Sequence, residues 1–308
     1  MRMALAATLM SAVLLAGCSD EEPAEAGKQP LVQPGSAAID PPAPPPEQLQ
    51  IDVAGADAAL AEPLTQDSID QTPPPVEAPP ANQGPVVPRL SIIIDDVGPS
   101  LAAGERIIAL PGPVALAIMP FTRNAQALAK LATEAGKPVM LHLPMENLAG
   151  LAIGEGGLST RMQRAAFDAQ LQVSLNAFSP IQGVNNHMGS KLTADRERMD
   201  WLMAQLDARQ LFFVDSRTTK DTQAAFAAQA RGVASVSRDV FLDNQRTDVE
   251  LEREFKLVLA RARKQGSAVL IGHPYPETLR FLERRLPELE EREGVQLVSV
   301  QTLLSRPH

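Results

Sequence analysis

The sequence predicts an α/β domain whose parallel sheet is closed, or nearly closed, into a barrel. Two observations predict this fold class. Apolar runs of strand length alternate with amphipathic segments of helix length, and the strand runs are apolar at successive positions. Such runs are typical of strands buried on both faces, as in parallel sheets with helical crossovers. The domain spans about residues 89–308, roughly 220 residues, which is ample for one core.

The individual elements follow from the same pattern. Strands are expected at 90–94, 114–118, 139–141, 181–185, 211–214, 234–240, 268–271 and 295–300, and helices at 124–135, 161–178, 194–209 and 249–264. The segment Thr247-Asp248-Val249-Glu250 predicts a capping box at the start of the last helix. Gly136 and Gly266 are expected to be left-handed, just past two helix ends.

The amino terminus, residues 1–18, resembles a bacterial lipoprotein signal. A short basic start precedes an apolar run at 4–16 that is too short to span a bilayer, and Leu15-Ala16-Gly17-Cys18 resembles a lipobox. The resemblance implies cleavage before Cys18 and a lipid anchor on its thiol, which would hold the protein at a membrane on the periplasmic side of the envelope. Ser19 lacks the aspartate that resembles an inner-membrane retention signal, which favours the outer membrane. An ordinary secretory signal with an incidental cysteine is the alternative.

Residues 19–88 are expected to form a disordered, Pro-rich linker. The segment consists mostly of Pro, Ala, Gln, Glu and Asp, and it cannot bury enough apolar surface to offset the entropy of the chain. It is either a tether that lets an anchored domain search a polymer network or a linker with no such role. Cys18 is the only cysteine, so no disulfide within the chain and no cysteine-based zinc site can form.

Charge and aromatic content argue against nucleic acid as a partner. The formal net charge is −9 and the pI is near 5.1, with no basic stripe that could neutralise phosphates. The single tryptophan, Trp201, and the single tyrosine, Tyr275, also make a poor stacking platform for bases.

A pair of carboxylates follows the first predicted strand. In Ile92-Ile93-Ile94-Asp95-Asp96-Val97-Gly98 an apolar run leads directly to Asp95 and Asp96, which face different directions if the strand pleat persists. One could bind a metal while the other takes a proton from water. The alternative is that one of them caps the next helix. The pair favours a functional site, because barrels of this class hold their active sites at the carboxyl ends of the strands.

Three of the four histidines also follow predicted strands. His142 and His187, together with one carboxylate, would make a three-ligand metal site with room for water. His273 ends a late strand, and its imidazole could protonate a leaving amine. The alternatives are that His142 and His187 are hydrogen-bonded core residues and that His273 only bonds a neighbouring loop.

Five segments together resemble the divergent branch of the NodB-like polysaccharide deacetylases. The resemblance covers essentially all of 89–305 and rests on Ile-Ile-Ile-Asp-Asp-Val-Gly, His-Leu-Pro-Met-Glu, Asn-Asn-His-Met-Gly-Ser, Phe-Val-Asp-Ser-Arg-Thr and Gly-His-Pro-Tyr-Pro. It implies a distorted (β/α) barrel that removes acetyl groups from the N-acetylated sugars of a glycan, such as peptidoglycan. It also implies a divalent metal, usually zinc. The sequence leaves the oligomeric state open.

The resemblance implies roles for individual residues. Asp95 matches the catalytic base and His273 the general acid, while Asp96 and His142 match metal ligands. The main family has a second histidine four residues after the first, where this chain has Glu146. We therefore expect His187 to complete the ligand set, with Glu146 as the alternative third ligand.

The remaining candidates lie in Val214-Asp215-Ser216-Arg217-Thr218. Asp215 and Arg217 are expected either to orient the base or bind substrate, or to form an ion pair at a strand end. The arginine-containing motif that the main family has after its fourth strand is not recognisable in this chain, and His187 appears in that region instead. Two functions therefore stay open: a metal-dependent deacetylase, and a tethered glycan-binding or scaffolding domain of the envelope without turnover. An acid and a base retained together favour the enzyme.

Overall fold

The computed structural model describes residues 87–304. The predicted signal peptide with Cys18 and almost all of the predicted linker lie outside the described residues. The strands are β1 (Arg89–Val97), β2 (Ala115–Ile118), β3 (Val139–Met145), β4 (Gly183–Met188), β5 (Phe212–Asp215), β6 (Ser235–Ser237), β7 (Val240–Phe241), β8 (Ser267–Gly272) and β9 (Gln296–Leu297). The helices are α2 (Leu101–Ala109), α3 (Ala125–Glu134), α4 (Arg164–Leu175), α5 (Arg196–Ala208), α6 (Ala224–Arg231), α7 (Asp248–Gln265), α8 (Pro276–Arg285) and α9 (Leu289–Glu293), with 3-10 turns η2 (Leu286–Glu288) and η3 (Val300–Leu303).

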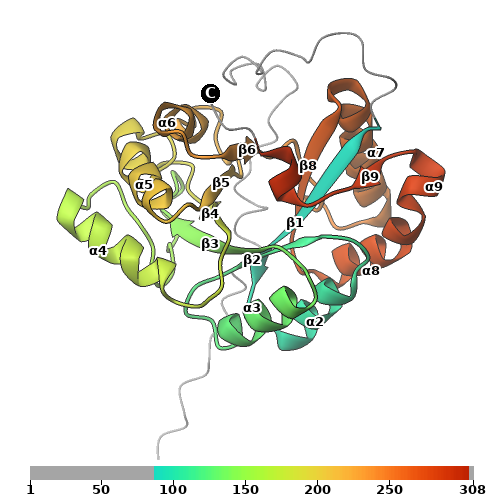
Figure 1. Cartoon of the computed structure of the whole chain (residues 1–308), viewed down its shortest axis with the longest axis horizontal. Coiled ribbons are helices and arrows are strands. Elements are labelled where there is room, and N and C mark those ends of the chain that lie inside the picture. The colour runs from blue at the N-terminus through green and yellow to red at the C-terminus, as the bar shows by residue number, and fades with distance from the viewer. Residues whose placement is uncertain (1–86, 305–308) are drawn as a thin grey trace, which may run out of the picture. The chain divides into compact units, whose positions relative to one another are not determined.

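The named strands pair only in parallel, in the order β6-β5-β4-β3-β2-β1-β8-β7. Strand β9 adds to the first two residues of β1, ahead of the point where β2 begins to pair. The helices flank the strands, with α4, α5 and α6 on one side and α7, α8 and α9 on the other (Figure 1). Within residues 87–304 no ladder joins the two end strands, β6 and β7. The fold is therefore a curled, open half-barrel, which confirms the predicted α/β fold of distorted barrel type.

The two faces of the sheet carry different cores. Ile92 and Ile94 of β1 belong to the large core that the strands share with the surrounding helices. Ile93, between them, belongs to a smaller inner cluster that includes Val300 of η3. This alternation is the period of a strand, and it defines the inner face on which the polar residues described below are placed.

Strand β3 runs further than the sequence predicted. The expected strand at 139–141 stops before His142, whereas β3 continues to Met145 and includes Pro144. A proline is tolerated there because the pairing of β2 with β3 ends at Leu141, so no β2 carbonyl is left waiting for the missing N–H of Pro144. On that edge the Pro144 carbonyl accepts a hydrogen bond from the Leu158 N–H, next to a bridge between Met145 and Leu158. His142 consequently lies inside a strand, where its side-chain direction is set by the pleat.

Other differences arise where polar or helix-neutral residues weaken the pattern. The predicted strand at 234–240 is two strands, β6 and β7, because Arg238 and Asp239 between them make side-chain hydrogen bonds to the backbone of neighbouring segments. The one at 295–300 is β9 followed by η3. Helices α2, α6, α8 and α9 were not predicted. Helix α6 is rich in alanine, and α8 begins with Pro276 at its first turn, where proline is compatible with a helix.

The predicted helix ends are largely confirmed. Gly136 and Gly266 have φ angles of 71° and 83° just beyond α3 and α7. Thr247 caps α7, since its hydroxyl accepts a hydrogen bond from the Glu250 N–H at 3.3 Å. The Glu250 carboxylate instead pairs with Arg253, so the other half of the predicted capping box is replaced by an ion pair along the helix.

Removing this cap is expected to lower the free energy of unfolding by about 1 kcal/mol. Thr247→Ala leaves the Glu250 N–H without its side-chain acceptor, and the loss should appear in urea denaturation as a lower midpoint with an unchanged slope. The control is Val249→Ala in the first turn of the same helix, because the Val249 side chain is 75% exposed and makes little core contact. Equal effects of the two substitutions would contradict a capping role.

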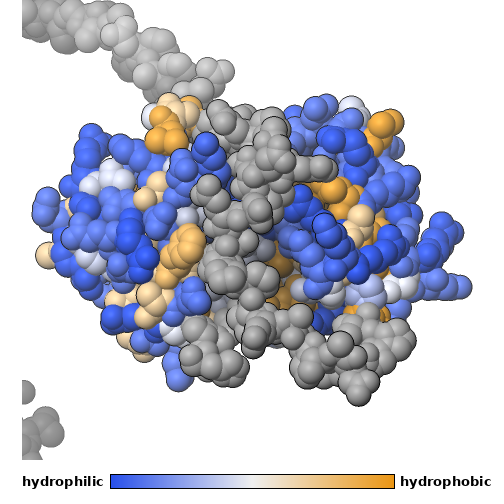
Figure 2. All heavy atoms as spheres, turned by 90° about the horizontal axis from the view of Figure 1, so that it is seen from above, coloured by the Kyte–Doolittle hydropathy of each residue, from blue (hydrophilic) through white to orange (hydrophobic). Residues whose placement is uncertain are grey.

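The coloured part of the face seen in Figure 2 is mainly hydrophilic. In Figure 2 hydrophilic residues cover most of the coloured surface, and hydrophobic residues are gathered in small patches. None of the helices in residues 87–304 combines the length and the apolar character needed to cross a bilayer.

Candidate metal centre and catalytic site

The polar residues of the site project from the inner face near the carboxyl ends of the strands. Because side chains alternate, the inner position after Ile93 in β1 is Asp95, and the one after Met140 in β3 is His142. The same rule places His273 on the inner face, directly after β8. All of these polar side chains are buried.

Asp96 joins the group because the pleat of β1 breaks. Its φ angle is 54°, and the register between β1 and β2 shifts between Ile94 and Val97. A regular strand would send Asp95 and Asp96 to opposite faces. Instead, Nε2 of His142 lies 3.9 Å from Oδ2 of Asp95 and 3.2 Å from Oδ1 of Asp96. Left-handed backbone at a non-glycine residue costs energy and is concentrated at functional sites.

The alternative in which an aspartate caps the next helix is wrong. Ser100 is the N-cap of α2, and its hydroxyl accepts a hydrogen bond from the Ala103 N–H at 3.2 Å. Asp95 and Asp96 are therefore available to the site.

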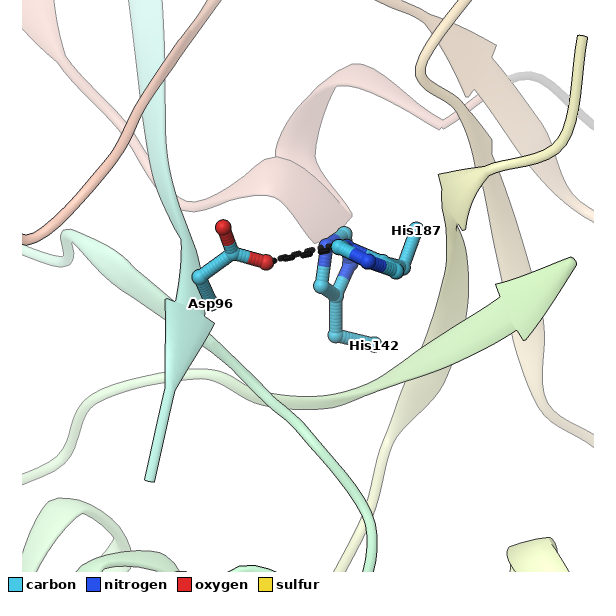
Figure 3. Close-up of side chains that lie close together, drawn as sticks. All are labelled: Asp96, His142 and His187. Carbon is cyan, nitrogen blue, oxygen red and sulfur yellow. Dashed lines mark hydrogen bonds and ion pairs between the residues drawn. The ribbon is translucent and has the colours of Figure 1, made fainter. Parts of the chain in front are cut away.

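Three potential metal ligands converge in the half-barrel: Asp96, His142 and His187 (Figure 3). Oδ1 of Asp96 lies 3.2 Å from Nε2 of His142 and 3.0 Å from Nδ1 of His187, and the two nitrogens are 3.1 Å apart. Ligands that are about 2.0–2.1 Å from a tetrahedral zinc ion lie roughly 3.3 Å from one another. The donor set therefore fits one divalent metal ion.

The two neighbouring aspartates have opposite pKa shifts. Burial raises the pKa of Asp95 to about 6, and the carboxylate of Asp96 adds to this, although the imidazoles of His142 and His273 act against it. Burial also disfavours the charge of Asp96, but its contacts with His142 and His187 outweigh burial and hold its pKa well below the usual range. The contacts of Asp96 therefore favour its anionic form, whereas Asp95 can exchange a proton near neutral pH.

His273 is held in the protonated form by a residue that the sequence reasoning missed. Oδ1 of Asp243 lies 2.9 Å from Nδ1 of His273, and Oδ2 accepts hydrogen bonds from the His273 N–H and the Thr278 hydroxyl, both at 2.7 Å. Burial opposes the charge on His273, but the Asp243 carboxylate raises the pKa of the imidazole to about 10. Nε2 has no hydrogen-bond partner within residues 87–304. It can therefore donate its proton to a bound ligand.

Replacing Asp243 is expected to change how stability depends on pH. The folded pKa of His273, about 10, lies above the value near 6.5 of an unfolded histidine, so its contribution is fully present below pH 6.5 and is lost as the pH rises towards 10. Asp243→Asn removes the carboxylate and lowers this pKa. Urea unfolding of the metal-free proteins between pH 6 and 10 should show the wild type losing up to about 1.4 kcal/mol per pH unit more than the variant. Identical pH slopes would contradict the assignment.

Asn185 is a second residue that the sequence reasoning missed. It lies in β4 opposite His142, and its side-chain oxygen is 2.9 Å from Nδ1 of His142. Its amide nitrogen donates to Oδ1 of Asp95 at 2.7 Å. The signal was present in Asn185-Asn186-His187, because residues two apart on a strand share a face and Asn185 therefore shares the inner face with His187.

The structure places Glu146 outside the ligand group. Its Oε2 accepts hydrogen bonds from the N–H and the hydroxyl of Thr160, both at 2.7 Å, and its Oε1 lies 2.8 Å from Nζ of Lys191. Burial acts against this carboxylate, but Lys191 and Thr160 together lower the pKa of Glu146 to about 2. Glu146 thus joins the segment after β3 to the segment after β4.

Asp215 and Arg217 organise the end of β5. Oδ1 of Asp215 accepts from the backbone N–H of Arg217 at 2.8 Å, and Oδ2 accepts from the Thr222 hydroxyl at 2.9 Å. Burial raises the pKa of Asp215. Arg217 is buried with a left-handed φ of 49°, and its carbonyl accepts from Arg238. The side chains of the described residues Asp215 and Arg217 do not form an ion pair with each other. The predicted alternative of a strand-end ion pair between them is therefore wrong.

Comparisons with known proteins agree with this architecture. The chain is 38% identical over 215 residues to an uncharacterized protein of Haemophilus influenzae. The aligned region covers 70% of this chain and 76% of that protein. The chain is also 33% identical over 219 residues to the uncharacterized protein YibQ of Escherichia coli, covering 71% of this chain and 68% of that one. A crystal structure of an uncharacterized protein from Agrobacterium tumefaciens has the same fold, with a TM-score of 0.68 and 22% identity over 72% of this chain and 91% of the other.

The family comparison covers nearly the whole described domain. The family described as divergent polysaccharide deacetylase matches residues 92–304, from the middle of β1 to the end of η3. This range includes all the inner-face residues described above. The chain therefore belongs to the divergent polysaccharide deacetylase family.

Proposed function

We propose that the domain is a metal-dependent hydrolase that removes N-acetyl groups from a glycan. The observation that carries the proposal is a carboxylate oxygen, Oδ2 of Asp95, and an imidazole nitrogen, Nε2 of His273, that have no hydrogen-bond partner within residues 87–304 and belong to the same buried site as the ligand group. The pKa of Asp95 is raised to about 6, so it can accept a proton at neutral pH, and the pKa of His273 is raised to about 10, so it can donate one. A binding module needs no such acid and base.

Asp96, His142 and His187 would hold the metal, for which zinc is the first choice. Two imidazole nitrogens and one carboxylate oxygen suit zinc and also iron. Such an ion supplies Lewis acidity, which polarises the acetamide carbonyl and lowers the pKa of water. The fit rests on the mutual distances of the three ligand atoms, which are all 3.2 Å or less.

The chain's own residues then carry the proton transfers. Oδ2 of Asp95, which has no hydrogen-bond partner within residues 87–304, takes a proton from the attacking water. The water oxygen forms a bond to the acetamide carbon, and the C–N bond of the acetamide breaks. Nε2 of His273 gives its proton to the departing amine nitrogen, so that acetate and a free amino sugar leave.

The substrate class and location extend this proposal. Family membership favours an acetylated glycan, and the lipobox-like segment ending at Cys18 favours a protein that is lipid-anchored on the periplasmic side of the envelope. Ser19, in place of an aspartate after the cysteine, favours the outer membrane. Peptidoglycan is the acetylated polymer that such an anchored protein would meet.

Acetate release from N-acetylated oligosaccharides tests the proposal. Wild-type protein loaded with zinc is expected to release acetate and one free amine per event, and Asp95→Asn, a nearly isosteric change, is expected to abolish both products. Metal binding without acetate release from several N-acetylated glycans would favour the tethered glycan-binding or scaffolding domain. Equal release by wild type and Asp95→Asn would exclude Asp95 as the base.

A further inference from the structure

Asn185 lies between His142, one of the three potential metal ligands, and Asp95, the proposed base. It is fully buried in β4, and strand pairing sets it opposite His142. Its side-chain oxygen lies 2.9 Å from Nδ1 of His142, and its amide nitrogen lies 2.7 Å from Oδ1 of Asp95. The same nitrogen is 3.4 Å from the Ser216 hydroxyl at the end of β5. One amide therefore contacts two functional residues on two other strands.

The chemistry of these neighbours allows only one orientation of the amide. An ionised carboxylate can only accept hydrogen bonds, so the NH₂ group of Asn185 must face Asp95 and its oxygen must face His142. The oxygen can only accept, so Nδ1 of His142 must carry a proton. In a neutral imidazole the lone pair is then on Nε2, which is the atom 3.2 Å from Oδ1 of Asp96 in the ligand group.

The same amide differentiates the two oxygens of Asp95. Oδ1 receives the hydrogen bond from Asn185, whereas Oδ2 has no hydrogen-bond partner within residues 87–304. The oxygen that Asn185 leaves open is the one 3.9 Å from Nε2 of His142, next to the ligand group. The neighbouring Asn186 has a different role, because its side chain bonds the backbone of Ser216 and Met188.

We infer that Asn185 is a positioning residue that presents Nε2 of His142 to the metal and Oδ2 of Asp95 to the attacking water. The catalytic part of this inference, the orientation of Asp95, rests on the proposed function. The metal-binding part, the orientation of His142, depends only on the contact between Asn185 and His142. One amide therefore fixes the positions of a metal ligand, His142, and the base, Asp95, relative to each other, although the two residues lie on different strands.

Two substitutions test the metal-binding part and the catalytic part of the inference separately. Asn185→Asp keeps an oxygen for the Nδ1 proton of His142, but its ionised carboxylate cannot donate to Asp95 and repels it, so at a pH where both carboxylates are ionised zinc affinity should change by less than about tenfold while kcat falls by at least about tenfold. Asn185→Leu has a similar size and offers neither bond, so zinc affinity should fall by about 10–100-fold in addition to the loss of kcat. Zinc affinity is measured by competition with a chromophoric chelator.

A destabilised control excludes a merely structural effect. Phe255→Leu removes a buried ring in α7 that packs against Phe281 in the helix-side core, and it should lower stability while zinc affinity and kcat stay near wild type. The inference is overturned if Asn185→Asp keeps kcat within twofold of wild type, or if Asn185→Leu binds zinc as tightly as wild type. If the wild type releases no acetate, the proposed function fails. The zinc affinity of Asn185→Leu then still decides whether Asn185 orients His142.

Discussion

Replacing Asp96 with asparagine is expected to abolish tight metal binding. Oδ1 of Asp96 is close to both imidazoles of the ligand group, at 3.2 Å from Nε2 of His142 and 3.0 Å from Nδ1 of His187. Asp96→Asn removes the only anionic ligand, so the loss of zinc affinity should exceed the 10–100-fold that typically follows loss of an outer hydrogen-bond partner. Isothermal titration of zinc into the chelator-treated protein measures the effect.

Glu146→Gln is the matched control for this experiment. It also removes one negative charge from a carboxylate, but Glu146 is bound to Lys191 and Thr160 and lies outside the ligand group. We expect zinc affinity to remain within about twofold of wild type and only stability to fall, in the range of a part-buried ion pair. A large loss of zinc affinity in Glu146→Gln, with little loss in Asp96→Asn, would make Glu146 the third ligand.

Replacing His273 with glutamine is expected to reduce kcat by about 10²–10⁴-fold, the usual contribution of a general acid. Glutamine retains a hydrogen-bonding side chain but has no proton to transfer to the amine. His273 is not one of the three ligands, so zinc affinity should be unchanged. Acetate release and zinc titration on the same preparation provide the two readouts.

The pH profile gives an independent check on His273. Since its pKa is about 10 and is set largely by Asp243, wild-type activity should decline on the alkaline side as this proton is lost, and Asp243→Asn should move that decline to lower pH. A profile whose alkaline limb is unaffected by Asp243→Asn, or a His273→Gln variant with kcat within tenfold of wild type, would contradict the general-acid role.

Much of the fold could be predicted because apolar runs report buried parallel strands directly. The same reasoning could place His273 directly after β8 and Asp95 near the carboxyl end of β1, although the predicted end of the first strand at residue 94 is wrong, because β1 continues through Asp95 to Val97. It could not predict that Asp96 would turn inward beside Asp95. That arrangement depends on a left-handed residue and a register shift against β2, which only the assembled sheet determines.

The supporting residues escaped prediction for a different reason. Asn185 and Asp243 are 43 and 30 positions from the histidines they contact. Side-chain alternation places Asn185 on the same face as His187, but no local pattern pairs it with His142 or pairs Asp243 with His273. Glu146 shows the opposite case. Its spacing from His142 suggested a ligand, but the structure pairs it with Lys191 and Thr160, because the segments after β3 and β4 meet at that point.

The most direct test of the account is a zinc titration of acetate release by the chelator-treated protein. The account predicts no release of acetate from an N-acetylated oligosaccharide before zinc is added, and a rise that saturates at one zinc ion per chain. It also predicts that Asp96→Asn shows no rise over the same zinc range. Full acetate release without metal, or one bound zinc per chain with no acetate released, would contradict the central claim.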